Sequence, residues 1–131
     1  LCAAVGSPDA HAGEVPVAYV QLKQNASASS EELLAYARQH IPERAALPKR
    51  IDILDALPVT PVGKIFKPAL LQIEIAKVIE HEAAQGGLGG VELDIRQDSR
   101  RGLVAFIRAG ANRQALEQRL GKFTFPIEWI N

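Results

Sequence analysis

The chain has 131 residues, and its 15 basic and 15 acidic side chains balance to a formal net charge of zero. That balance gives no support for nucleic acid or an anionic membrane surface as a partner. The length suits a single domain, and a lone cysteine, Cys2, excludes an intrachain disulfide, disfavours a cysteine-ligated metal site and fits a reducing cytoplasm.

No run of apolar residues approaches the roughly 18 that a membrane-spanning helix needs, and no signal-peptide pattern opens the chain. The sequence begins at Leu1, inside an apolar stretch that reads as the middle of a strand. We therefore expect a fragment of a longer cytoplasmic protein.

The first half of the sequence alternates apolar stretches with turn and cap signals. Residues 15–23 are nearly all apolar and rich in β-branched side chains, which predicts a buried strand. Ser29 followed by Glu32 is the capping-box pattern of a helix start, and Pro42 ends that helix. The predicted elements are, in order, a strand at 1–5, a turn at 6–9, a strand at 15–23, a helix between Ser29 and Pro42 and a strand at 50–57.

In the second half, a helix and a linker precede residues 91–131, which repeat the strand, strand, helix, strand order of residues 1–57. Pro68 suits the first turn of a helix that runs to about Ala84. Residues 86–90 hold four glycines, and we interpret them as a flexible linker; a phosphate-binding loop is the less favoured reading, because no strand leads into it. The predicted elements beyond are a strand at 91–97, a turn at 98–102, a strand at 103–109, a helix at 112–120 and a strand at 126–130. We expect a second ββαβ lobe at 91–131.

The most informative segment is residues 57–65, which read LPVTPVGKI. Pro58 and Pro61 fix the backbone and remove two donors, so we expect a rigid loop that continues neither a strand nor a helix. Gly63 permits a sharp turn or the close approach of a ligand, and Lys64 follows it as a presented cation. A phosphate-binding P-loop is excluded, because Pro58 and Ile65 stand where it needs a glycine and a Ser or Thr. An ordinary solvated lysine in a turn remains open on this segment alone.

Further ordered blocks surround this segment. They read VGSPD at 5–9, VPVAYV at 15–20, EELLAYAR at 31–38, LPKR at 47–50, IDILDALP at 51–58 and TPVGKIFK at 60–67. Together they resemble the small C-terminal lid domain of the adenylate-forming superfamily, which includes acyl-CoA synthetases, luciferases and peptide-synthetase adenylation domains, and they are most like an AMP-forming acyl-CoA synthetase. Residues 71–131 carry no part of this resemblance.

The resemblance implies an α+β fold for residues 1–70, a small mixed sheet flanked by helices, and the sequence pattern adds the second ββαβ-like lobe at the C-terminus. We therefore expect a lid domain at 1–70, a connecting helix at 71–85, the linker at 86–90 and the extension at 91–131. The implied activity is that of an acid–thiol ligase, which activates a fatty or aromatic carboxylic acid with ATP and passes the acyl group to coenzyme A. A peptide-synthetase adenylation domain and a non-catalytic binding module of the same fold are the alternatives.

The resemblance also assigns residues and partners. Lys64 is implied as the adenylation lysine, with Gly63 beside the ligand. Lys49, with Arg50, is implied on the coenzyme A face, although Ala45 and Ala46 replace the aromatic and the lysine of the family's pattern there. ATP, with Mg, is expected in a large N-terminal domain of the same protein, without which we expect the isolated domain to be inactive. His11, His40 and His81 lack ligand-like spacing, and we predict no metal site on them.

Overall fold

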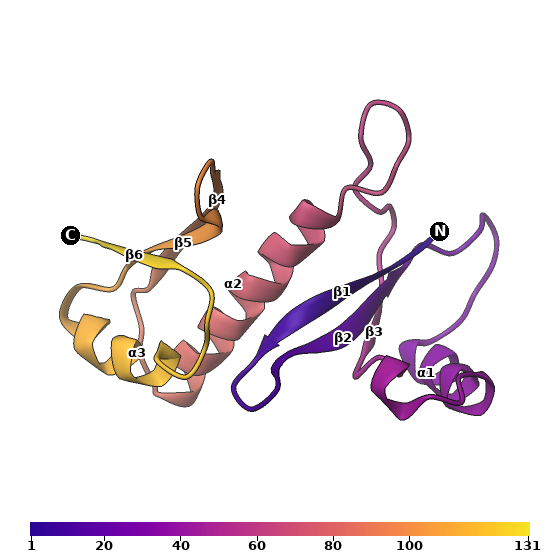
Figure 1. The fold of residues 1–131 in the computed structure, drawn as a ribbon, viewed down its shortest axis with the longest axis horizontal. Coiled ribbons are helices and arrows are strands. Elements are labelled where there is room, and N and C mark those ends of the chain that lie inside the picture. The colour runs from indigo at the N-terminus through magenta and orange to yellow at the C-terminus, as the bar shows by residue number, and fades with distance from the viewer. The chain divides into compact units, whose positions relative to one another are not determined.

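The computed structural model describes all residues from 1 to 131 (Figure 1). The chain divides into two compact units. Unit 1 comprises residues 1–7 and 14–70, and unit 2 comprises residues 8–13 and 71–131. None of the helices is both long enough and apolar enough to cross a membrane.

Unit 1 contains a three-stranded sheet in the order β1-β2-β3. A tight turn joins β1 to β2, and β2 pairs with β3 in parallel, with Ala18 opposite Ile51. A parallel pair needs a crossover connection, and α1 lies in that crossover. We call this ββαβ arrangement the first lobe. Its elements are β1 (Cys2–Asp9), β2 (Gly13–Val20), α1 (Ser30–His40), the 3₁₀ turn η1 (Arg44–Ala46) and β3 (Ile51–Ile53).

The predicted turn at 6–9 is wrong, because those residues are the last four of β1. The chain reverses at residues 10–12, where the Asp9 carboxylate accepts the backbone N–H groups of His11 and Ala12 at 3.0 and 2.8 Å. Pro8 is tolerated in β1 because β1 is an edge strand. Strand β3 is also shorter than the predicted strand at 50–57.

Helix α1 confirms the capping signal in the sequence. Ser29 is the N-cap, and its hydroxyl accepts the backbone N–H of Glu32 at 3.1 Å. The helix ends at His40, with Ile41 donating its N–H to the carbonyl of Ala37 at 2.8 Å. Its buried residue Ala37 packs with Ala18 and Ile51, so α1 covers β2 and β3.

Helix α2 (Lys67–Gln85) contains Pro68 in its first turn, as predicted. It ends in a Schellman motif, in which Leu88 donates to the carbonyl of Ala83 at 2.8 Å and Gly87 donates to that of Ala84 at 3.1 Å. Gly87 has a φ of +65°, a backbone conformation that glycine adopts without strain. The stretch interpreted as a linker therefore begins as a hydrogen-bonded helix cap.

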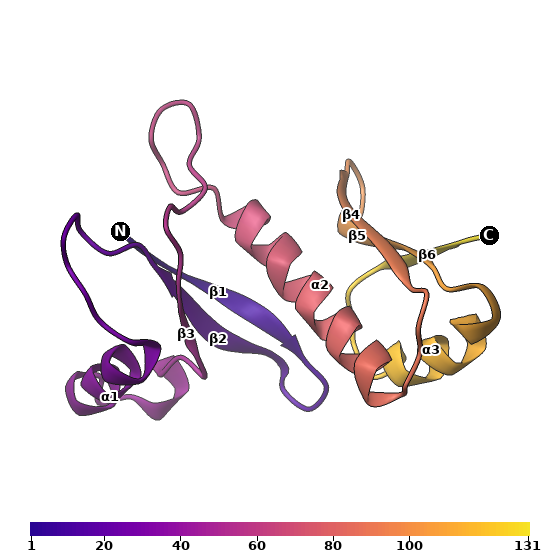
Figure 2. The ribbon, with the colours of Figure 1, turned by 180° about the vertical axis from the view of Figure 1, so that it is seen from behind.

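Unit 2 contains the second ββαβ arrangement, which we call the second lobe (Figure 2). Strands β4 and β5 are antiparallel, and β5 and β6 are parallel with Ile107 opposite Trp129. The elements are β4 (Glu92–Asp98), β5 (Gly102–Arg108), the 3₁₀ turn η2 (Gly110–Asn112), α3 (Arg113–Leu120) and β6 (Ile127–Ile130). Its core joins α2, α3 and one sheet face through Ile75, Ile79, Ala83, Ala105, Ile107, Ala109, Leu116 and Leu120.

The predicted fold class is confirmed: the chain is α+β, with small mixed sheets, helices and a second ββαβ lobe. All five elements expected between residues 91 and 130 are present, within one residue or so of their predicted ends. The division into a lid domain, a connecting helix, a linker and an extension stays a prediction.

Candidate functional site

Residues 58–66, which contain Lys64, form a small β-hairpin rather than an irregular loop. Val59 and Ile65 form an antiparallel bridge, and Phe66 donates its N–H to the carbonyl of Pro58 at 2.8 Å. Neither proline interrupts this pairing, because Pro58 supplies an acceptor and Pro61 lies in the turn. We call this segment the lysine hairpin.

Three hydrogen bonds fix the turn of the lysine hairpin, and Thr60 takes part in each of them. The N–H of Thr60 donates to the carbonyl of Lys64 at 2.7 Å, and Gly63 donates to the carbonyl of Thr60 at 2.9 Å. The Thr60 hydroxyl accepts the N–H of Lys64 at 3.2 Å. Gly63 has a φ of +86°, as a three-residue hairpin turn with a left-handed final residue requires. Lys64 therefore leaves the hairpin from a defined backbone position.

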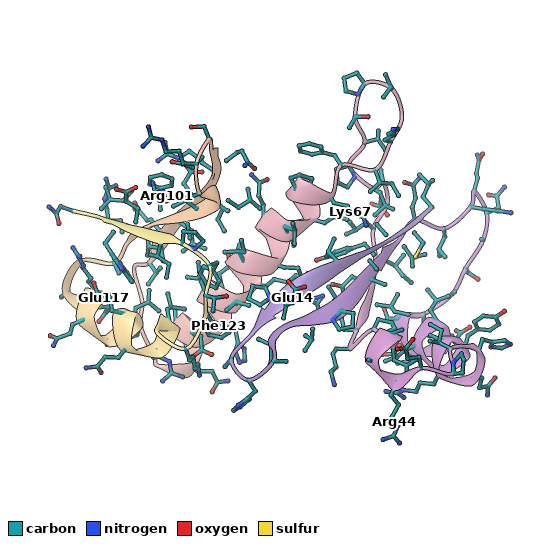
Figure 3. The ribbon with its side chains drawn as sticks, in the orientation of Figure 1. Glu14, Arg44, Lys67, Arg101, Glu117 and Phe123 are labelled. Atoms are coloured by element: carbon teal, nitrogen blue, oxygen red, sulfur yellow. The ribbon has the colours of Figure 1, made fainter.

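Lys64 is exposed, and so are three apolar side chains of the hairpin, Val59, Val62 and Phe66. Val62, at the tip, is 82% exposed, and Val59 and Phe66 are about half exposed. Lys67 follows, also exposed, at the first residue of α2 (Figure 3). A cation surrounded by exposed apolar side chains suits a surface that binds an anion while covering the apolar tip.

A second candidate region is an open groove of about 840 Å³ between the end of α1 and the start of β3. Three cationic side chains line it, Arg38, Arg44 and Lys49, together with His40 and the apolar residues Ile41, Pro42, Leu47 and Pro48. Arg44 projects from the end of unit 1 that carries α1 (Figure 3). We call this region the basic groove. Its charge and its size suit a phosphorylated ligand.

The backbone around the basic groove is held in place at two points. The N–H of Lys49 donates to the carbonyl of Pro16 in β2 at 2.8 Å. The N–H of Leu47 donates to the carbonyl of Arg44 at 3.1 Å, closing η1. The 3₁₀ turn thereby brings Arg44 and Lys49 to the same groove as Arg38.

Of the two residues expected on the coenzyme A face, Lys49 lines the basic groove. Arg50 does not line it, and its guanidinium forms an ion pair with the carboxylate of Asp52 at 2.5 Å. Arg38 and Arg44 were not singled out from the sequence. The signal that could have found them is the density of cations between residues 38 and 50, but Arg38 lies in the last turn of a helix, where a basic residue is ordinary.

The structure does not bring the two candidate regions together. The lysine hairpin precedes α2 at one end of unit 1, and α1 lies at the other end in both views (Figures 1 and 2). The basic groove is lined by residues from the end of α1 and the segment that follows it. No group of three or more His, Cys, Asp or Glu side chains is arranged to hold a metal ion. The chain thus presents a lysine on a hairpin and, separately, a groove lined by cations.

Comparison with known proteins gives a consistent result for the first half of the chain. Residues 1–64 match the profile of the AMP-binding enzyme C-terminal domain. The long-chain-fatty-acid–CoA ligase of Bacillus subtilis (strain 168) is 42% identical over 53% of this chain. The marinolic acid–CoA ligase of Pseudoalteromonas sp. (strain SANK 73390) is 41% identical over 89% of this chain, so that similarity extends into the second lobe.

Solved structures agree with these matches. The fatty acyl CoA synthetase of Mycobacterium tuberculosis matches 58% of this chain with a TM-score of 0.51 and 33% identity. Apo MatB from Rhodopseudomonas palustris matches 55% with a TM-score of 0.50 and 26% identity. The chain spans only 12% of the Bacillus subtilis ligase and 18% of the marinolic acid–CoA ligase, and 15% and 14% of these two structures.

Proposed function

Residues 1–64 belong to the AMP-binding enzyme C-terminal domain family, and from this premise we propose that the chain is the C-terminal domain of an acyl-CoA synthetase. The proposed enzyme activates a fatty or aromatic carboxylic acid with ATP and transfers the acyl group to coenzyme A. A large N-terminal domain of the same protein would bind ATP, its Mg²⁺ and the acid. The similarity to CoA ligases of which this chain spans less than a fifth supports that arrangement.

We assign Lys64 to the first half-reaction. There a carboxylate oxygen attacks the α-phosphorus of ATP, the bond to pyrophosphate breaks, and an acyl-adenylate forms. Negative charge gathers between two anions that repel each other. An ammonium placed near the α-phosphate and the carboxylate oxygen stabilises that arrangement more than it stabilises the separated reactants.

One observation carries this assignment: the lysine hairpin presents Lys64 from a fixed and exposed turn. The hydrogen bonds that Thr60 makes with Gly63 and Lys64, together with the left-handed conformation of Gly63, define where the backbone of Lys64 lies. The exposed Val62 at the tip would be covered when the hairpin enters the large domain. Covering an apolar tip on closure would also exclude water from the reacting groups.

We assign the basic groove to the second half-reaction. The thiol of coenzyme A attacks the acyl carbon, the carbon–oxygen bond to AMP breaks, and the proton of the thiol is lost to solvent or a base. Coenzyme A carries phosphate groups at its nucleotide end, and Arg38, Arg44 and Lys49 line a groove that would bind them. Arginine suits a phosphate through its planar set of donors, whereas lysine acts as a point charge.

The separation of the two regions has a consequence for the reaction cycle. One active site cannot face both ends of unit 1 at once. We therefore infer that this domain turns between the half-reactions, presenting the lysine hairpin for adenylation and the basic groove for thioester formation. This would be a rigid-body domain movement about a hinge.

Acid-dependent exchange of pyrophosphate into ATP tests the proposed function. The full-length protein is assayed with a panel of short-chain, long-chain and aromatic acids, and the chain of residues 1–131 is assayed beside it. We expect exchange with one class of acid for the full-length protein and none for residues 1–131 alone. A folded full-length protein that shows no exchange with any acid would instead be a non-catalytic module.

A further inference from the structure

In the lysine hairpin, the backbone N–H of Lys64 donates to a side chain and not to a carbonyl. A regular hydrogen-bonded pair of antiparallel residues exchanges both N–H groups for both carbonyls, so Lys64 would donate to the carbonyl of Thr60. The left-handed Gly63 takes that carbonyl at 2.9 Å. The N–H of Lys64 donates instead to the hydroxyl of Thr60 at 3.2 Å. The threonine side chain thus supplies the acceptor that the turn removes from the backbone.

Packing contributes little to the position of this turn. The four residues that form it, 61–64, are all exposed. A Cβ at Gly63 would meet no atom within 4 Å outside its two chain neighbours. The direction in which Lys64 leaves the hairpin is therefore set by the hydrogen bonds of the turn more than by contacts with the rest of the chain.

Thr60 itself has a fixed position at the base of the turn. Its N–H donates to the carbonyl of Lys64 at 2.7 Å, and the bridge between Val59 and Ile65 lies directly behind it. Thr60 is half-buried, in contrast to the exposed residues of the turn. A threonine side chain is also stiff, because two heavy atoms on its Cβ restrict χ1. The hydroxyl of Thr60 is therefore a defined acceptor for the N–H of Lys64.

We propose that Thr60 is the positioning residue of Lys64: its hydroxyl, by accepting the backbone N–H of Lys64, fixes the direction in which the lysine side chain enters the adenylation site. This rests on the proposed function, because the reaction that Lys64 would serve is acyl-adenylate formation. Thr60 acts through Lys64 and supplies no group to the reacting atoms. Displacement of an oriented group by about 1 Å can slow a reaction by roughly 10²-fold, so one hydrogen bond beside the lysine matters to the rate.

Thr60→Val tests this role, because valine keeps the shape of threonine and removes the hydroxyl. Pyrophosphate exchange by the full-length protein is measured with an acid that the wild type accepts. We expect kcat to fall by roughly 2- to 10-fold, the factor that the loss of one hydrogen bond produces. The KM values for ATP and for the acid should stay at their wild-type values, because the variant loses an interaction that serves the transition state. Thr60→Ser keeps a hydroxyl and should recover most of the rate.

Two further variants separate positioning from stability. In the first, Thr60→Val is combined with Lys64→Ala. Because Thr60 acts through Lys64, the double variant should exchange pyrophosphate at the rate of Lys64→Ala alone. The second is Thr124→Val, which alters the only other threonine of the chain, an exposed residue in the second lobe. It should leave kcat at the wild-type value.

The contrary results are equally specific. A kcat for Thr60→Val equal to that of the wild type would overturn the proposal, even if the melting temperature fell. So would a Thr60→Ser variant no faster than Thr60→Val, or a further loss when Thr60→Val is added to Lys64→Ala. Absence of exchange from the wild-type protein with every acid would refute the proposed function itself, whereas normal exchange by both wild type and Thr60→Val would refute only the role of Thr60.

Discussion

The two lobes share one ββαβ topology and differ in the connection between the helix and the last strand. In the first lobe, residues 41–50 join α1 to β3, contain η1 and line the basic groove. In the second lobe, residues 121–126 join α3 to β6, and Phe123 and Phe125 in this connection pack against the core. The connection from helix to last strand thus lines an open groove with cations in the first lobe, whereas in the second lobe its aromatic side chains pack against the core.

This difference indicates where function resides in such a fold. The strands and helices set the positions at which the connections leave the sheet, and the connections carry the chemistry. The first lobe also leads into the lysine hairpin before α2 begins. We therefore expect substitutions in the first lobe's connections to change activity, and substitutions in the second lobe's core to change stability.

The largest effect is expected from Lys64→Ala. Loss of one well-placed cation in phosphoryl-type chemistry lowers the rate by on the order of 10²–10⁵, and we expect a loss in that range for pyrophosphate exchange. The matched control is Lys67→Ala, which removes another exposed lysine three residues away and should retain most of the exchange. Similar losses in the two variants would mean that Lys64 acts only through general surface charge.

Leu116→Ala tests the expectation that the core of the second lobe contributes to stability and not to activity. Leu116 is fully buried in the core of the second lobe, and truncation of such a leucine costs about 2–5 kcal/mol of unfolding free energy. Denaturant unfolding of the full-length protein should show this loss in the transition that reports the second lobe. Pyrophosphate exchange at low temperature should stay close to wild type; its collapse would show that the lobes do not divide stability from chemistry.

Substitutions of Gly63 test whether the role of Lys64 depends on the left-handed turn that precedes it. A Cβ at Gly63 would meet no atom within 4 Å outside its two chain neighbours, so any effect of substitution comes from the backbone at φ +86°. An alanine held in the left-handed region costs about 1–2 kcal/mol, whereas asparagine tolerates that region better. Exchange rates should fall in the order Gly63, Gly63→Asn, Gly63→Ala. Equal rates for the two variants would argue against a required left-handed turn.

The smallest effect concerns the turn between β4 and β5. Backbone hydrogen bonds from Arg100 and Arg101, together with the guanidinium of Arg101, lower the pKa of Asp98 below its ordinary value of 3.8. A lowered folded pKa contributes stability above that ordinary value, and the contribution is lost as the pH falls through the folded pKa. The stability difference between wild type and Asp98→Asn should therefore shrink below about pH 4. A difference that is constant with pH would contradict this role of Asp98.

Much of the fold follows from local signals in the sequence. Ser29 predicted the start of α1, Pro68 the start of α2, and the repeated order of elements predicted the second lobe. The end of β1 could not be read in this way, because Gly6 and Pro8 are typical turn residues. In the structure both residues lie within β1.

The candidate site was predictable only in part, for a physical reason. Lys64 and Gly63 are adjacent in a segment with strong turn signals, so their presentation could be expected from the sequence. The cations of the basic groove are dispersed over residues 38–49 without any periodicity, and η1 is what brings them to one groove. Arg50, adjacent to Lys49, was expected beside it and instead pairs with Asp52.

The central claim is that Lys64 acts in adenylation and not in thioester formation. The most direct test supplies purified acyl-adenylate and coenzyme A to Lys64→Ala and to wild type, and measures thioester formation beside pyrophosphate exchange. We predict that exchange falls by on the order of 10²–10⁵ while thioester formation remains near the wild-type rate. An equal loss in both half-reactions would contradict the assignment of Lys64 to adenylation.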